Sequence, residues 1–151
     1  MNWLIVRTDF RKEAYVAQQV RALGFDAWVP AQLIASRPAI ARRVSAKSGL
    51  RQIKELPILP RRLFAAVPVA LEADLMRIRH LVAVEHDADS RPVSVPSSQI
   101  AAFKSAIDAE NTAALALATR PNRKQKARWR SLKDGLLEAI EAAKQQMEQA
   151  A

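Results

Sequence analysis

The chain has 151 residues, 50% of them apolar, and carries 24 basic against 15 acidic side chains, for a formal net charge of +9. This length suffices for one modest core with an appendage and is too short for two ordinary domains. The sequence contains no cysteine and no apolar run of about 18 residues, which excludes disulfides and thiolate metal sites and predicts that no segment spans a membrane. This composition is compatible with a cytoplasmic protein.

The basic residues gather in two clusters. Residues 31–62 hold eight basic side chains and one acid, and residues 120–133 hold seven basic side chains and no acid. The remainder of the chain is net negative. Two local clusters on a slightly acidic body indicate contact with a polyanion better than uniform basicity would. The alternative is that basic loops simply keep a small protein in solution.

The first thirty residues predict a helix between two strands. Residues 2–8 form a short apolar run rich in strand formers, which predicts a strand buried on both faces. Apolar residues at three- and four-residue spacing predict a helix over 11–23, and Gly24 supplies its C-terminal stop. Residues 25–30 alternate around Trp28 and predict the second strand.

Residues 31–56 sustain no period, because proline, serine and glycine interrupt the segment. We predict a projecting basic hairpin of low intrinsic stability, with arms at 33–34 and 40–44 around a turn at 47–49. A disordered insertion is an equally weighted alternative.

The next segments predict a strand over 63–69, a helix over 71–80, a strand over 81–84 and a helix that begins at 96–98. Since neighbouring residues on a strand face opposite ways, we expect only one of Leu63 and Phe64 to be core. The fold class predicted is α+β, with a small, mainly antiparallel four-stranded sheet, about three helices, a basic hairpin insertion and a C-terminal helical extension.

The C-terminal segment has a helical pattern. From Trp129 onward, apolar residues lie on one helical face of a segment rich in Ala, Glu, Gln and Lys, which predicts a long amphipathic helix. Residues 97–118 and 129–149 are compatible with a helical hairpin, which acts either as a lid over the sheet or as a basic contact to nucleic acid or polymerase. We favour the contact because the charge is concentrated at the junction. The predicted organisation is a domain over 1–110, a basic junction over 111–128 and the amphipathic helix over 129–151.

Residues that would carry catalysis or bind a metal are absent or dispersed. The three glycines are widely separated, so there is no phosphate-binding loop. His80 and His86 are six residues apart across a predicted strand, a spacing that does not suit a metal site. Ser97 fits a helix cap, and Asp87 and Asp89 fit a solvated turn. We therefore predict a protein that is not an enzyme and has no metal, no cofactor and no small-molecule substrate.

Three segments resemble the N-terminal domain of the NusG/RfaH transcription elongation factors. They are WLIVRTDFRKEAYVAQQVRALGFDAWVP over 3–30, PILPRRLFA over 57–65 and RPVSVP over 91–96. The family begins with a Trp-containing strand, a helix running into a Gly-Phe-type turn and a strand ending in Pro. It continues with a motif like Pro-Leu-Phe-Pro-Gly-Tyr-Val-Phe-Val, and with a Pro-Ala-x-Val-Pro segment that leads into its last helix. The resemblance covers residues 2–108.

The resemblance implies a protein that binds the clamp helices of the RNA polymerase largest subunit through an apolar patch on the sheet. It also implies contact with upstream DNA, and with nascent RNA as a further partner, and an effect on pausing or termination. Arg61 and Arg62 stand where the family has a glycine and a tyrosine, which indicates an altered or more electrostatic contact. The polymerase-binding residues implied are Leu59, Pro60, Arg61, Arg62 and Phe64.

Basic residues around the first helix, in the hairpin and at the C-terminal junction are expected to lie near phosphates without reading bases. They are Arg11, Lys12, Arg21, Arg42, Arg43, Lys47, Arg51, Arg123, Lys124, Lys126, Arg128 and Arg130. The helical pattern of 109–151 departs from the β-barrel (KOW) domain that usually follows in the family, so partners of that barrel are not expected.

The sequence thus predicts a specialised bacterial or phage NusG paralogue, a cytoplasmic and nucleoid-associated elongation or antitermination factor that acts by binding. The alternative is a stand-alone basic nucleic-acid-binding module that does not act through RNA polymerase.

Overall fold

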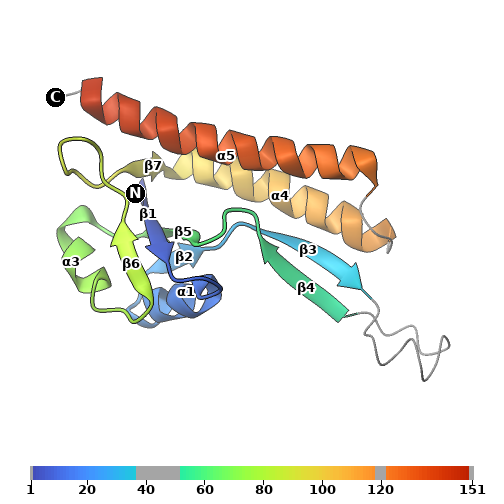
Figure 1. Cartoon of the computed structure of the whole chain (residues 1–151), viewed down its shortest axis with the longest axis horizontal. Helices are drawn as coiled ribbons and strands as arrows, with labels where there is room; N and C mark the ends of the chain where they lie inside the picture. The colour runs from blue at the N-terminus through green and yellow to red at the C-terminus, as the bar shows by residue number, and fades with distance from the viewer. Residues whose placement is uncertain (1, 37–51, 118–121, 150–151) are drawn as a thin grey trace.

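The computed structural model describes residues 2–36, 52–117 and 122–149 (Figure 1). It confirms the predicted α+β class. The strands are β1 (Asn2–Thr8), β2 (Asp26–Trp28), β3 (Ala31–Ser36), β4 (Gln52–Pro57), β5 (Arg62–Ala66), β6 (Leu81–Val84) and β7 (Ser94–Pro96). The helices are α1 (Glu13–Ala22), the 3₁₀ turn η1 (Val69–Leu71), α3 (Glu72–Leu75), α4 (Ser97–Leu117) and α5 (Arg123–Gln149).

The main sheet is antiparallel, with the strand order β2-β5-β1-β6 and with β7 also paired to β1. Strand β1 is therefore central, and its register pairs Leu4 with Ala65 of β5. The sheet has five strands where four were predicted. The additional strand, β7, has only three residues, too few for a periodic signal, and it is defined by pairing with a strand about ninety residues earlier in the chain.

Both faces of the main sheet are covered. Trp3 and Ile5 of β1 belong to the core cluster that α4 and α5 complete, whereas Leu4 and Val6 belong to the cluster that α1 and α3 complete. Burial on both faces explains why β1 is continuously apolar instead of alternating. The expectation that only one of two neighbouring β5 residues is core was wrong, because Leu63 and Phe64 are both buried, on opposite faces.

The predicted hairpin has β3 and β4 as its arms, in a register that pairs Leu33 with Glu55. The second arm was predicted at 40–44, which lies outside the described residues; the segment that pairs with β3 is Gln52–Pro57. The hairpin is held to α4 by Asn111, whose Oδ1 accepts a hydrogen bond from the Leu33 N–H (2.8 Å) and whose Nδ2 donates to the Ala31 carbonyl (3.0 Å). The Asn111 amide thus pairs with the outer edge of β3 as a neighbouring strand would.

Helices α4 and α5 run side by side on the same face of the sheet (Figure 1). Helix α5 packs into the core there through Trp129, Leu136 and Ile140, all nearly fully buried. The helices approach closely at Gly135, where a Cβ atom would lie 3.3 Å from the ring of Phe103.

The predicted domain boundary at 110 falls within α4, and the predicted junction over 111–128 contains the end of α4 and the start of α5. None of the helices in the described ranges is both long and apolar enough to cross a membrane.

Candidate nucleic-acid and polymerase interface

Two of the three apolar residues of the predicted polymerase patch, Leu59 and Phe64, are buried, whereas Pro60 is exposed. Leu59 is 2% exposed and Phe64 is 1% exposed, and both belong to the core cluster that includes Leu136 of α5. Trp28 stacks on Phe64 with ring centroids 5.5 Å apart. In this conformation Leu59 and Phe64 contact the protein's own helices, so a partner reaches them only by displacing α5.

Arg61 occupies a tightly held turn before β5. Its φ of 65° lies in the left-handed region that favours glycine. Its N–H donates to Glu13 Oε1 (2.7 Å), and its carbonyl accepts from the Thr8 N–H (2.8 Å). Because Glu13 is buried and belongs to α1, these bonds fix the turn to both α1 and β1.

An exposed aromatic side chain lies beside this turn. Phe10 is 57% exposed, and the guanidinium groups of Arg11 and Arg61 lie 5.0 Å and 5.5 Å from its ring centroid. Cations near an aromatic face are attracted to its π electrons. The exposed Phe10 ring thus lies close to two positive charges.

Arg62 is half-buried and forms an ion pair inside the protein. Its guanidinium lies 3.6 Å from Glu85, whose carboxylate also lies 3.8 Å from Arg7 and 3.5 Å from Lys144 of α5. The Glu85 side chain is 11% exposed. Lys144 also lies 3.6 Å from Glu141, so three cations face two carboxylates in a cluster that connects the sheet to α5.

The two basic clusters of the sequence meet beside α5. A hollow of about 190 Å³ is lined by Arg7, Arg61, Arg62 and Lys133 above an apolar floor that includes Leu59. A second hollow of about 350 Å³ shares Lys133 and is also lined by Arg130. We call the surface formed by Arg7, Arg61, Arg62, Arg130 and Lys133 the basic groove. The site residues predicted from the sequence included neither Arg7 nor Lys133, although Lys133 belongs to the second basic cluster.

The residues predicted to bind nucleic acid do not form one surface. Arg11, Lys12 and Arg21 are exposed on the α1 side of the sheet, where Arg21 Nη2 donates to the Ala27 carbonyl (2.7 Å). Five further residues are exposed on the first two turns of α5, which covers the opposite face (Figure 1). These are Arg123, Lys124, Lys126, Arg128 and Arg130, of which Arg128 pairs with Glu110 at 3.7 Å. Arg42, Arg43, Lys47 and Arg51 lie outside the described residues.

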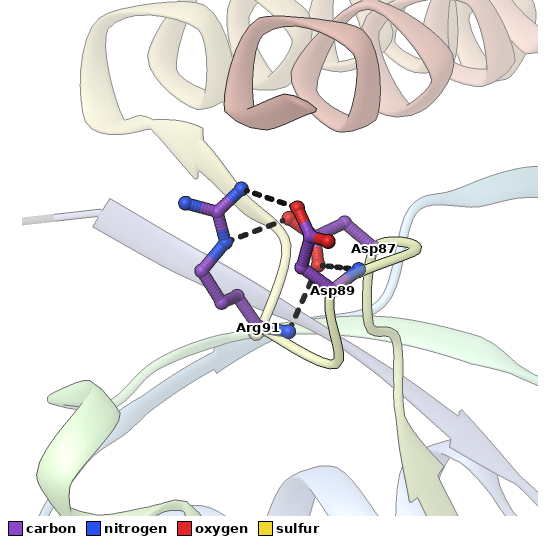
Figure 2. Close-up of polar contacts among 3 residues, drawn as sticks. All are labelled: Asp87, Asp89 and Arg91. Atoms are coloured by element: carbon purple, nitrogen blue, oxygen red, sulfur yellow. Dashed lines mark hydrogen bonds and ion pairs between the residues drawn. The ribbon is translucent and has the colours of Figure 1, made fainter. Parts of the chain in front are cut away.

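The loop between β6 and β7 is closed by an acid–base cluster (Figure 2). Asp87 Oδ1 accepts from the N–H groups of Asp89 and Arg91, each at 2.9 Å, and Arg91 Nε donates to Asp87 Oδ2 (3.1 Å). Arg91 Nη2 also donates to Asp89 Oδ2 (3.2 Å). The expectation of a solvated turn was wrong for Asp87, which is buried. The backbone N–H and then the charge of Arg91 lower the pKa of Asp87 against the opposing effect of burial.

The described residues offer no arrangement suited to a metal, since no three His, Cys, Asp or Glu side chains among them come together. A hollow of about 810 Å³ lies between α1 and the base of the hairpin and is lined by residues such as Phe10, Trp28 and Leu56. Its charged lining is two arginines, Arg11 and Arg21, and two glutamates, Glu13 and Glu55.

Comparison with known proteins adds no family: no family model matches the chain, and a search of curated proteins finds no match.

Proposed function

We propose that this protein is a NusG-type transcription elongation or antitermination factor. It binds the clamp helices of RNA polymerase and nearby nucleic acid, modulates pausing or termination, and acts in the cytoplasm at the nucleoid without catalysing a reaction. The observation that carries the proposal is the backbone at Arg61. The sequence motif aligns this residue with a turn glycine of the family, and its φ of 65° is the conformation for which glycine is ordinarily selected.

The covered sheet face supports the same proposal. Its apolar residues, Leu59 and Phe64 among them, already accept an amphipathic helix, which is α5 of the same chain. A face that packs against one helix offers the shape and chemistry needed for another. The clamp helices would then compete with α5, so α5 acts as a lid that polymerase displaces.

The proposal is tested by measuring how tightly RNA polymerase binds a variant in which the packing of α5 on the sheet is weakened. Leu136→Asp places a carboxylate at a position that is 1% exposed, which weakens the packing of α5 on the sheet. Ala142→Asp is the matched control, because it adds the same charge at an exposed position of the same helix. We expect core RNA polymerase to bind Leu136→Asp more tightly than the wild type, and Ala142→Asp to behave like the wild type. Adding Leu59→Asp to the Leu136→Asp variant should abolish its binding to RNA polymerase.

The proposal fails if neither the wild type nor Leu136→Asp retains polymerase while circular dichroism shows both to be folded. That outcome favours the second candidate, a stand-alone nucleic-acid-binding module. The exposure of the basic side chains supports this candidate. It predicts salt-dependent binding to naked nucleic acid without polymerase capture.

A further inference from the structure

The outer edge of β4 has no strand beside it in the described part of the chain. There, β4 pairs with β3 alone, and the Ile58 N–H that follows it donates to the Pro30 carbonyl (2.8 Å). Because hydrogen-bonded and non-hydrogen-bonded pairs alternate along an antiparallel ladder, the N–H and C=O groups of Glu55 and Ile53 face away from β3. A segment that lies along this edge in an extended conformation can therefore pair with these groups.

The opposite edge of the hairpin agrees with this alternation. Asn111 bonds to the Leu33 N–H and to the Ala31 carbonyl on the outer side of β3. Their partners across the ladder are Glu55 and Pro57, which therefore also direct their backbone groups outward. Pro57 has no N–H, but in an outward position this costs the hairpin no bond. Helix α4 thus closes the outer edge of β3, whereas the outer edge of β4 is open to a partner.

The hollow of about 810 Å³ opens beside this edge. Residues 55–57 of β4 line it, whereas β3 contributes Ala31. Its other walls include Ala14 and Ala17 of α1, whose side chains are small, and Trp28. A strand paired with β4 would point alternate side chains toward this hollow, and its apolar walls suit a large apolar side chain. Added strands are bound in this way, with backbone bonds for affinity and side-chain pockets for specificity.

The charges on β4 distinguish a partner protein from a second copy of this chain. Lys54 and Glu55 are exposed and form no ion pair within the described residues. In a symmetric antiparallel pair of strands, one residue lies opposite itself. The two registers with the greatest overlap place Lys54 against Lys54 or Glu55 against Glu55, and like charges directly opposite each other are destabilising. Complementary charges require a different strand, with an acid opposite Lys54 and a base opposite Glu55.

We propose that β4 binds an extended segment of a partner protein as an added antiparallel strand. From its N-terminal end, the segment carries a large apolar side chain opposite Pro57 and a second apolar side chain opposite Leu56. A basic side chain then faces Glu55, and an acidic one faces Lys54. The first apolar side chain enters the hollow. This site lies apart from the sheet face that α5 covers, so it goes beyond the proposed function.

The probe is a fluorescein-labelled peptide, Thr-Phe-Val-Lys-Glu-Val-Thr, whose binding to the full chain is followed by fluorescence anisotropy. Its control is Thr-Phe-Val-Glu-Lys-Val-Thr, in which the two charges are exchanged. We expect the probe to bind about fivefold or more tightly than the control. Lys54→Glu combined with Glu55→Lys should reverse this preference, a result that a damaged fold cannot produce.

N-methylated probes test whether the contact is a pair of strands. The lysine of the probe lies opposite Glu55 and directs its N–H toward β4, whereas the N–H of the following glutamate points away. We expect N-methylation of the lysine to abolish saturable binding, and N-methylation of the glutamate to leave the affinity little changed.

Ala14→Trp tests the hollow, because it places a large side chain at an exposed position in its wall. Gln18→Trp is the matched control, since Gln18 is also exposed on α1 but does not line the hollow. We expect Ala14→Trp to weaken binding of the probe by about tenfold or more, as the phenylalanine of the probe loses its burial. Gln18→Trp should bind like the wild type.

The proposal is overturned if the probe does not bind at millimolar concentration, if both charge patterns bind equally, if N-methylation of the lysine is tolerated, or if Ala14→Trp matches Gln18→Trp. It is also overturned if the protein self-associates and the probe dissociates it, because a second copy then occupies the edge. A failure of polymerase binding would leave all of these results standing.

Discussion

Truncation of Leu136 measures whether α5 is an integral part of the core. Leu136→Ala removes three carbons from a side chain that is 1% exposed. At about 0.8 kcal/mol per buried methylene, the transfer cost is about 2.4 kcal/mol. The cavity left beneath α5 adds to this cost, and comparable substitutions cost about 2–5 kcal/mol in total. We therefore expect the free energy of unfolding to fall by about 3 kcal/mol.

The assay is urea unfolding monitored by circular dichroism, with Leu4→Ala as the matched control. Leu4 is also 1% exposed, but it lies on the sheet face covered by α1. With a slope of about 2 kcal/mol per molar urea, a loss of 3 kcal/mol lowers the midpoint by about 1.5 M. If α5 is docked as described, the two variants lose similar amounts.

A smaller loss for Leu136→Ala than for Leu4→Ala would mean that α5 leaves the sheet before the domain unfolds. In that case the loss is limited to the free energy of docking. A loss below about 0.5 kcal/mol, together with rapid amide exchange along α5, would refute the assignment of Trp129, Leu136 and Ile140 to the core.

Three further predictions concern single contacts. Because the pKa of Asp87 is lowered in the folded state, its carboxylate stabilises the protein at a pH above the ordinary pKa of 3.8, and this stabilisation is lost as the pH falls through the lower folded-state pKa. The stability difference between the wild type and Asp87→Asn should therefore shrink in that acidic range. A constant difference would contradict the ion pair with Arg91. Arg61→Gly should be more stable than Arg61→Ala by about 1 kcal/mol in thermal unfolding, because alanine retains the strain of a positive φ; equal stabilities would show that the turn is not left-handed. Asn111→Ala should cost about 1–2 kcal/mol and accelerate amide exchange at Leu33, whose N–H loses its acceptor; unchanged exchange there would argue against the contact between α4 and β3.

Local patterns predicted the first elements closely. The strand expected over 2–8 is Asn2–Thr8, and the helix expected over 11–23 is Glu13–Ala22. The strand was predicted from a short apolar run and the helix from its periodicity and the stop signal at Gly24, all of which are encoded within a few residues. The helix expected over 71–80 ends early, since η1 and α3 together extend only from Val69 to Leu75. Four residues of helix leave too little periodic pattern to locate its end.

The pairing of strands that are distant in the sequence was predicted less accurately. The second arm of the hairpin was expected within 40–44, but β3 pairs with Gln52–Pro57. Strand register depends on which residues meet across the gap between two segments, and residues 31–56 carry no alternation strong enough to fix it. The five-strand sheet requires the same kind of information, because β7 exists only through its pairing with β1.

The sequence by itself determined the α+β class, the amphipathic character of α5 and the presence of two basic clusters, because composition and periodicity are local properties. It did not determine what the apolar face of α5 covers or which cations become neighbours. Tertiary packing decided that α5 lies over Leu59 and Phe64 and that Lys133 lines a recess with Arg61 and Arg62. A helical period shows that a helix has an apolar face but does not show which residues that face packs against. A charge count shows an excess of cations but not where they lie in the fold. The contacts that give Arg61 and Arg62 their proposed roles arise only when residues distant in the sequence are brought together by the fold.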